Sequence, residues 1–186
     1  MDIQSLIKDW QDFYKEVFGI EVDFSQLHIP KHQEGFDRLI VVAQGMTPRK
    51  LYDKCSEMFP CWKGIDGDLD KVITSGRTAK NGPYAVWVRD CQEADEELKN
   101  LSANKLKQMK IPAITFEERL LFELKFFKET GKHLDLENWT LCAGSRYGDG
   151  HVPSVIWSSY YLGGLLVDQY FSHSYYDSRR ARKAVS

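Results

Sequence analysis

One segment of the chain carries a complete set of helix signals, and the rest of the fold has to be built around it. Residues 115–131 read TFEERLLFELKFFKETG, in which Thr115 and Glu118 have the spacing of a capping box. Gly131 suits the left-handed residue that ends many helices. One face is apolar and consists of Phe116, Leu120, Leu121, Leu124 and Phe127. Because such a face has to be covered, we expect this helix to pack in the core.

Shorter patterns predict further helices and strands. Apolar residues recur with helical spacing over residues 3–18, which predicts an amphipathic N-terminal helix. That helix is expected to pack on the protein's own core, with a contact to a second subunit as the alternative. Thr47 followed by Pro48 predicts a helix that runs to Met58. Three other segments are assigned by composition, namely strands at 36–43 and 84–89 and a charged, partly helical stretch at 94–109.

The composition is typical of a soluble globular protein. Hydrophobic residues make up 42% of the 186 positions and charged residues 28%. The net charge of −2 excludes a protein that is basic throughout, and no apolar run reaches the ~18 residues of a membrane helix. No signal peptide is visible at the start, so the cytoplasm is the default expectation. Because no linker interrupts the elements, we predict a single α+β domain over residues 1–186 with short antiparallel strands.

The motifs for metal ions are incomplete. Asp66, Asp68 and Asp70 resemble the start of a calcium-binding loop, but Lys71 stands where that loop needs glycine and Arg77 where it needs glutamate. The cysteines include no CxxC pair and no zinc-binding spacing; they are Cys55, Cys61, Cys91 and Cys142. Free thiols are expected, with a Cys55–Cys61 disulfide as the alternative. We therefore predict neither a metal nor a cofactor.

The composition changes sharply over residues 147–178. Six of the nine tyrosines of the chain lie here, with six serines and four glycines, whereas Lys, Glu, Met and Arg are absent. Tyrosine offers a large amphipathic contact area with few rotors, and serine and glycine add adaptable small contacts. This is the composition of a recognition surface, although an aromatic-rich edge of a β domain would share part of it.

Two stretches of this segment alternate as strands do. Val155 and Trp157 are expected on a fixed inner face with Val167 and Phe171. The residues between them, on the outer face, would be free to vary. We predict that the contact residues are Tyr147, His151, Ser154, Ile156, Ser158, Ser159, Tyr160, Tyr161, Leu166, Asp168, Tyr170, Ser172, His173, Tyr175 and Tyr176.

The C-terminal part of the chain resembles a known family. The residues that carry the resemblance are TLCAGSR at residues 140–146, Asp149-Gly150, Val152-Pro153, Val155, Trp157 and the ending RARKAVS at residues 180–186. They are similar to the variable proteins of diversity-generating retroelements, and the upstream ERLLFELKFFKETGKHLDLENWTLC is similar to the segment that precedes the variable region in such proteins. The resemblance covers roughly residues 83–186. It implies a C-type-lectin-like fold whose C-terminal part, here residues 147–178, displays the diversified side chains. The RGG-type motif of related lectin-like domains is absent, which indicates a divergent branch, archaeal or from uncultivated bacteria.

The family diversifies its proteins by mutation at template adenines, chiefly in AAY codons, and that implication constrains the residue types. Mutating both adenines of AAY cannot produce Lys, Glu, Gln, Met or Trp. Residues 147–178 contain only Trp157 and Gln169 from this group, and both fall on the expected inner face. The resemblance therefore implies a protein without enzymatic activity, which binds another protein or a cell-surface molecule through residues 147–178.

Two other functions stay open as alternatives. An enzyme on the same lectin-like fold could use Cys142, or could pair His151 and His173 with Asp149 and Asp177. A nucleic-acid binder could use the basic cluster near the C-terminus, which consists of Arg179, Arg180, Arg182 and Lys183. Neither pattern is specific for its function, so we rank both below recognition by the tyrosine-rich segment.

Overall fold

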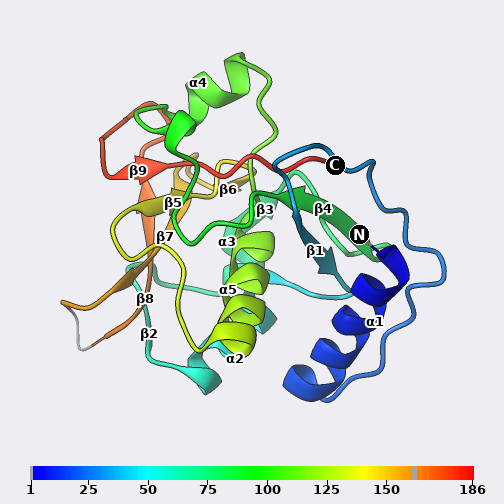
Figure 1. Ribbon diagram of the computed structural model, residues 1–186. Coiled ribbons are helices and arrows are strands. Elements are labelled where there is room, and N and C mark those ends of the chain that lie inside the picture. The colour runs from blue at the N-terminus through cyan, green and yellow to red at the C-terminus, as the bar shows by residue number, and fades with distance from the viewer. Residues whose placement is uncertain (1, 161–162) are drawn as a thin grey trace.

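The computed structural model describes residues 2–160 and 163–186 and has an α+β fold, as the sequence predicts. Helix α5 (Phe116–Thr130) lies at the centre of the molecule (Figure 1). On one side, β1 (Arg38–Val42) pairs antiparallel with β4 (Tyr84–Val88). A five-stranded sheet lies on the other side of α5 (Figure 1).

The capping signals of α5 act as predicted. Thr115 Oγ1 accepts the Glu118 amide at 3.2 Å, and the Glu118 carboxylate accepts the Thr115 amide at 2.8 Å. Gly131 ends the helix in the left-handed region with φ of 67°. The burial differs from that of an amphipathic helix, because charged residues on the far side of α5 are buried as well; they are Glu117, Glu118, Arg119, Glu123 and Lys125.

The N-terminal helix packs on the protein's own core. Helix α1 (Ile3–Phe13) continues as a π-helical turn at Tyr14–Phe18. The Trp10 indole donates to the carbonyl of Leu39 at 3.2 Å, and the Tyr14 hydroxyl donates to the carbonyl of Val41 at 2.8 Å. The apolar stripe of this helix thereby covers β1, which confirms the core interpretation.

The large sheet has the strand order β2-β8-β7-β5-β9. The pairs within β8-β7-β5 are antiparallel, as predicted, but β2 runs parallel to β8 and β9 runs parallel to β5. The expectation of antiparallel strands alone is therefore wrong at both edges, where long connections return the chain. The bounds of the strands are Cys61–Lys63 for β2, Trp139–Leu141 for β5, Val152–Ser158 for β7, Gly164–Tyr170 for β8 and Arg179–Arg180 for β9.

Shorter elements complete the fold. The predicted start of α2 (Pro48–Met58) is confirmed, since Thr47 Oγ1 accepts the Lys50 amide at 3.3 Å. Strands β3 (Ile73–Ser75) and β6 (Ser145–Tyr147) form a third, antiparallel pair. The remaining elements are α3 (Leu69–Val72), a 3₁₀ turn at Glu96–Leu98, and α4 (Ala103–Gln108), and the last two fulfil the expectation of a partly helical stretch.

A second, smaller core lies beside the main one. It brings α4 and neighbouring residues against one end of the five-stranded sheet (Figure 1). Its buried members are Leu98, Ala103, Leu106, Ala113, Leu141, Val152, Tyr170 and Ala181. This core covers part of the sheet face that the sequence assigns to solvent.

The C-terminal segment runs back through the middle of the fold. The amide of Ile114 donates to the carbonyl of Arg182 at 2.9 Å, and the amides of Ala184 and Val185 donate to the carbonyls of Pro112 and Trp87, both at 2.8 Å. Residues 181–185 therefore join two parts of the chain that are distant in sequence, around Trp87 and around Pro112 to Ile114.

The four cysteines are free thiols, so the structure contains no Cys55–Cys61 disulfide. None of the helices in the described part of the chain combines the length and apolar character that crossing a bilayer requires.

Candidate ligand-binding surface

The β7–β8 hairpin presents the predicted alternation. Val155 and Val167 pair across the strands and are buried on the inner face, as expected. Residues directly opposite one another share a face of the sheet. The outer pairs are Val152 with Tyr170, Ser154 with Asp168, Ile156 with Leu166, and Ser158 with Gly164. The sequence therefore predicts correctly which residues of the two strands share the outer face.

Trp157 belongs to the inner face and packs against the main core, but its side chain is partly exposed. The expectation of a buried Trp157 therefore holds only in part. Its ring contacts Phe59 at a centroid distance of 5.7 Å. The imidazole of His133 stacks between Trp157 and Phe127. The hairpin is thus anchored to α5 and to the end of α2 by contacts between aromatic rings.

Trp62 extends the outer face of the hairpin onto β2, and the sequence analysis did not identify it. Trp62 pairs with Leu166, which in turn pairs with Ile156, so the three side chains form an apolar row across β2, β8 and β7. The Trp62 side chain is 37% exposed. A three-residue strand shows no periodicity, so only its pairing with β8 reveals the role of this tryptophan. We call the exposed part of this surface, formed by Trp62, Ile156, Ser158, Leu166 and Asp168, the hairpin face.

Gly164 makes room for the Trp62 ring. A Cβ atom at this position would overlap the Trp62 ring and lie 2.7 Å from the carbonyl oxygen of Pro60. We expect Gly164→Ala to displace the ring and to lower the free energy of unfolding by about 1–3 kcal/mol. Chemical denaturation and tryptophan emission measure the two effects. Gly82→Ala is the control, because a Cβ there meets nothing within 4 Å; equal results for both variants would contradict the prediction.

A second group of aromatic side chains lies in residues 171–178, after β8; we call it the aromatic loop. The Arg179 guanidinium lies 3.8 Å from the centroid of the Tyr170 ring, and the Tyr176 ring meets Tyr170 edge-on at 5.8 Å. Burial lowers the pKa of Arg179 and raises that of Tyr170. The Ser172 carbonyl accepts the amide of Asn104 at 2.9 Å, which fastens the loop to α4.

Four of the burial expectations are wrong. Tyr147 is buried in the main core because β6 pairs with β3. Ser154 and Tyr170 occupy the outer face but are buried, since Leu141 pairs with Ser154 and the second core covers Tyr170. Phe171 is 55% exposed rather than inward, because β8 ends at Tyr170 and the alternation ends with it.

The other expected contact residues outside the hairpin face form two groups at opposite ends of the hairpin. Each strand has seven residues, so the ends are roughly 20 Å apart. Ser159 and Tyr160 are exposed at the tip, where Tyr160 reaches 96% exposure, and Tyr161 lies outside the described residues. His173, Tyr175 and Tyr176 are exposed in the aromatic loop, with His151 and Ser172 half-buried beside them. The hairpin face lies between these two groups.

The two histidines do not form a catalytic arrangement with a hydroxyl group. His151 Nδ1 lies 2.9 Å from Asp149, and its ring contacts Phe171 at 4.6 Å. His173 is exposed and contacts the same phenylalanine at 5.5 Å. Within the described ranges, neither histidine hydrogen-bonds a serine, threonine or tyrosine hydroxyl. Both rings therefore belong to the aromatic surface.

Cys142 does not have the environment of a nucleophile. Its side chain is fully buried, and burial raises the pKa of the thiol far above its ordinary value. A reactive cysteine needs access and a thiolate-stabilising environment. Among the residues described, no three His, Cys, Asp or Glu side chains gather as metal ligands would.

The basic cluster near the C-terminus does not form one patch. Arg182 is fully buried and donates to Asp135 at 2.7 Å, whereas Arg180 pairs with Glu96 at 2.6 Å. Arg179 stacks on Tyr170, and the Lys183 ammonium lies over the Phe36 ring. A phosphate-binding surface needs cations that share one exposed face, and these four side chains do not.

Comparison with protein-family models, with curated proteins and with solved structures finds no match to this chain.

Proposed function

We propose that this chain is a ligand-binding variable protein of a diversity-generating retroelement, with a C-type-lectin-like fold and no enzymatic activity. Its binding surface consists of the hairpin face, the hairpin tip and the aromatic loop. The ligand is another protein or a cell-surface molecule. The α+β architecture of short strands around a central helix is compatible with the fold that the sequence resemblance implies.

One observation carries the proposal. The partly exposed side chains on the outer face of the β7–β8 hairpin are Ile156, Ser158, Leu166 and Asp168, and all four belong to types that adenine mutation of AAY codons can produce. The two residues of excluded types in this segment, Trp157 and Gln169, both lie on the opposite face, where Trp157 packs against the main core and Gln169 is exposed. A side chain can vary freely only where the fold does not depend on it, so the partly exposed half of the outer face supports a surface that changes, whereas its buried members belong to the scaffold.

The chemistry of the surface suits protein recognition. Large aromatic side chains are exposed here, including Tyr160, Tyr175 and Tyr176 at 96%, 66% and 60% exposure. Tyrosine and tryptophan dominate the energetic centres of protein interfaces, and Trp62 adds one at the edge of the hairpin face. Charged residues on and beside this surface are few, namely Asp168, Asp177 and the stacked Arg179.

Two matched libraries test the proposal. The first places AAY-derived codons at Ser158, Tyr160 and Tyr175, and the second places them at Ser154, Tyr147 and Tyr170. Each set contains one serine and two tyrosines, but the first set is exposed or half-buried and the second is buried. We expect most displayed clones of the first library to resist protease, because exposed substitutions each change stability by about 0.5 kcal/mol or less. Most clones of the second library should be degraded.

Selection then tests binding itself. A larger library keeps Trp62 and varies the other four residues of the hairpin face together with Ser159, Tyr160, Tyr175 and Tyr176. It should yield clones that bind a purified model protein such as streptavidin. The genomic DNA beside the coding sequence should contain a reverse transcriptase gene and a near-copy of the segment for residues 147–178. Equal loss of folding in both matched libraries, or a genomic neighbourhood without a template copy, would contradict the proposal.

A further inference from the structure

A pocket away from the hairpin has the size and lining of a small-molecule site. It lies between the start of α2, strand β3 and the first turn of α5, and its volume is about 520 Å³. Ligand sites range over ~300–1,000 Å³ and combine apolar walls with a few polar groups. The apolar walls here come from Met46, Pro48 and Ile73. No part of the proposed binding surface contributes to this pocket.

Glu117 places a buried carboxylate in the wall of this pocket. It is the second residue of α5 and only 5% exposed. Its Oε2 atom accepts a hydrogen bond from the Ser75 hydroxyl at 2.6 Å, and Ser75 is the one side chain that hydrogen-bonds this carboxylate within the described ranges. A buried carboxylate ordinarily needs a cation or several donors. Glu117 therefore has unused capacity to accept hydrogen bonds from whatever occupies the pocket.

The charges around the pocket favour a cation. Glu117 and Asp70 line it with two carboxylates, and Lys80 contributes one ammonium group from an exposed position. Glu118 adds a further carboxylate behind Glu117, but it is already paired with Arg77 at 2.7 Å. One positive charge in the pocket would balance the lining.

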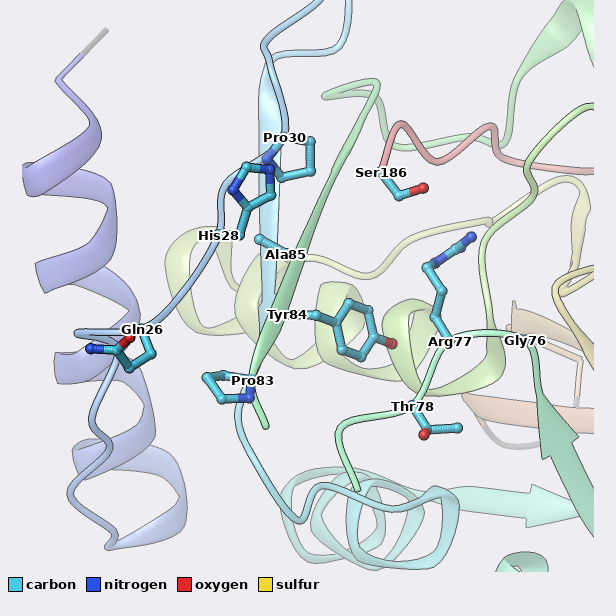
Figure 2. Close-up of a pocket in the computed structure, with 10 residues that line it drawn as sticks. All are labelled: Gln26, His28, Pro30, Gly76, Arg77, Thr78, Pro83, Tyr84, Ala85 and Ser186. Carbon is cyan, nitrogen blue, oxygen red and sulfur yellow. The ribbon is translucent and has the colours of Figure 1, made fainter. Parts of the chain in front are cut away.

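A neighbouring pocket has no side chain of aspartate or glutamate among the described residues that line it. It has a volume of about 550 Å³, and Figure 2 shows it between the segment with His28 and Pro30 and the side chains of Arg77 and Tyr84. The Arg77 guanidinium is occupied, because it donates to both Glu118 oxygens at 2.7 and 2.8 Å and to the Ala113 carbonyl at 2.8 Å. The arginine that lines this second pocket is therefore not free to bind a ligand.

We propose that the pocket with Glu117 in its wall binds a small organic amine. The ammonium group donates a hydrogen bond to the Glu117 carboxylate, beside the Ser75 hydroxyl. The apolar body of the ligand packs against Met46, Pro48 and Ile73. This site is independent of the recognition function proposed above and uses none of its residues.

Two probes that differ only in charge test the site. Phenethylamine and 3-phenylpropionate share an aromatic body, but one carries an ammonium group and the other a carboxylate. At pH 8 we expect phenethylamine to cause saturable shifts in the amide NMR signals of residues 73–78. The carboxylate probe should cause none there. This comparison uses the unmodified protein, so it does not depend on whether a variant folds.

A pair of variants assigns the binding to the carboxylate. Glu117→Gln keeps the shape of the side chain and an acceptor for Ser75, and we expect it to bind phenethylamine at least about tenfold more weakly, because a charge-assisted hydrogen bond is lost. Glu137→Gln is the control, since Glu137 is exposed and does not line the pocket. The proposal is overturned if both probes shift the same signals, if neither shifts residues 73–78, or if Glu117→Gln binds as tightly as the unmodified protein.

Discussion

Asp135→Asn is expected to lower the free energy of unfolding by about 3–5 kcal/mol, because it leaves buried cations without their partner. Asp135 accepts hydrogen bonds from Arg119 at 2.8 Å and from Arg182 at 2.7 Å, and Thr140 donates to it as well. Both arginines and the aspartate are fully buried. After the change, Arg119 would keep its ion pair with Glu123, but Arg182 would lose the carboxylate to which it donates.

The substitution isolates the charge. Asp135 has a φ of 55°, in the left-handed region that asparagine adopts as readily as aspartate. The substitution therefore introduces no backbone strain, and the loss of unfolding free energy measures the contribution of the ion pairs. Asp90→Asn is the control, because Asp90 pairs with Arg38 at 3.0 Å but is about half exposed, and such pairs contribute about 0–1 kcal/mol. Urea unfolding curves compare the two, and similar midpoints would show that the buried network is not a major source of stability.

The second large effect is a dependence of stability on pH that Glu117 causes. Burial, with smaller contributions from the nearby carboxylates of Glu118 and Asp70, raises the pKa of Glu117 from 4.5 to about 7. Between these two values, the folded protein holds a proton that the unfolded chain has released. Stability therefore falls as the pH rises from 4.5 to 7, by about 3 kcal/mol in total from this group.

Glu117→Gln removes this titration and leaves the others in place. We expect the unmodified protein to lose about 3 kcal/mol relative to the variant between pH 4.5 and 8. Denaturant unfolding at a series of pH values measures the unfolding free energies of both proteins. The histidines contribute equally to both, so their titration cancels in the difference. Parallel profiles would mean that Glu117 titrates near its ordinary pKa in the folded protein.

The sequence predicted most accurately those elements whose signals are local. Thr47 and Pro48 determine the start of α2, and the capping box and Gly131 determine both ends of α5. In each signal, a side chain hydrogen-bonds backbone groups only a few residues away. The start or end of the helix therefore depends little on tertiary contacts. The period-2 pattern of the hairpin is local in the same sense, and it assigned the faces of β7 and β8 correctly.

What the sequence missed depends on contacts between distant segments. Tyr170 belongs to the predicted outer face, but helix α4, more than sixty residues earlier, covers it. Trp62 joins the hairpin face only because β2 pairs with β8. Glu117 and Arg182 look like ordinary surface charges in the sequence, and their burial follows from the packing of the whole fold. Residue types alone cannot reveal any of these.

Under the proposed function, the path of residues 181–185 determines which mutations in residues 147–178 the protein tolerates. These residues join Pro112, Ile114 and Trp87, and Arg182 completes the buried network around Asp135. Residues 181–185 are translated after residues 147–178. A nonsense or frameshift mutation in residues 147–178 therefore removes residues 181–185 and their contacts with the core, and we expect the altered chain to be cleared as unfolded protein. For the proposed diversification, only in-frame substitutions would then yield a folded product, and the fold would act as a proofreading step on the variants.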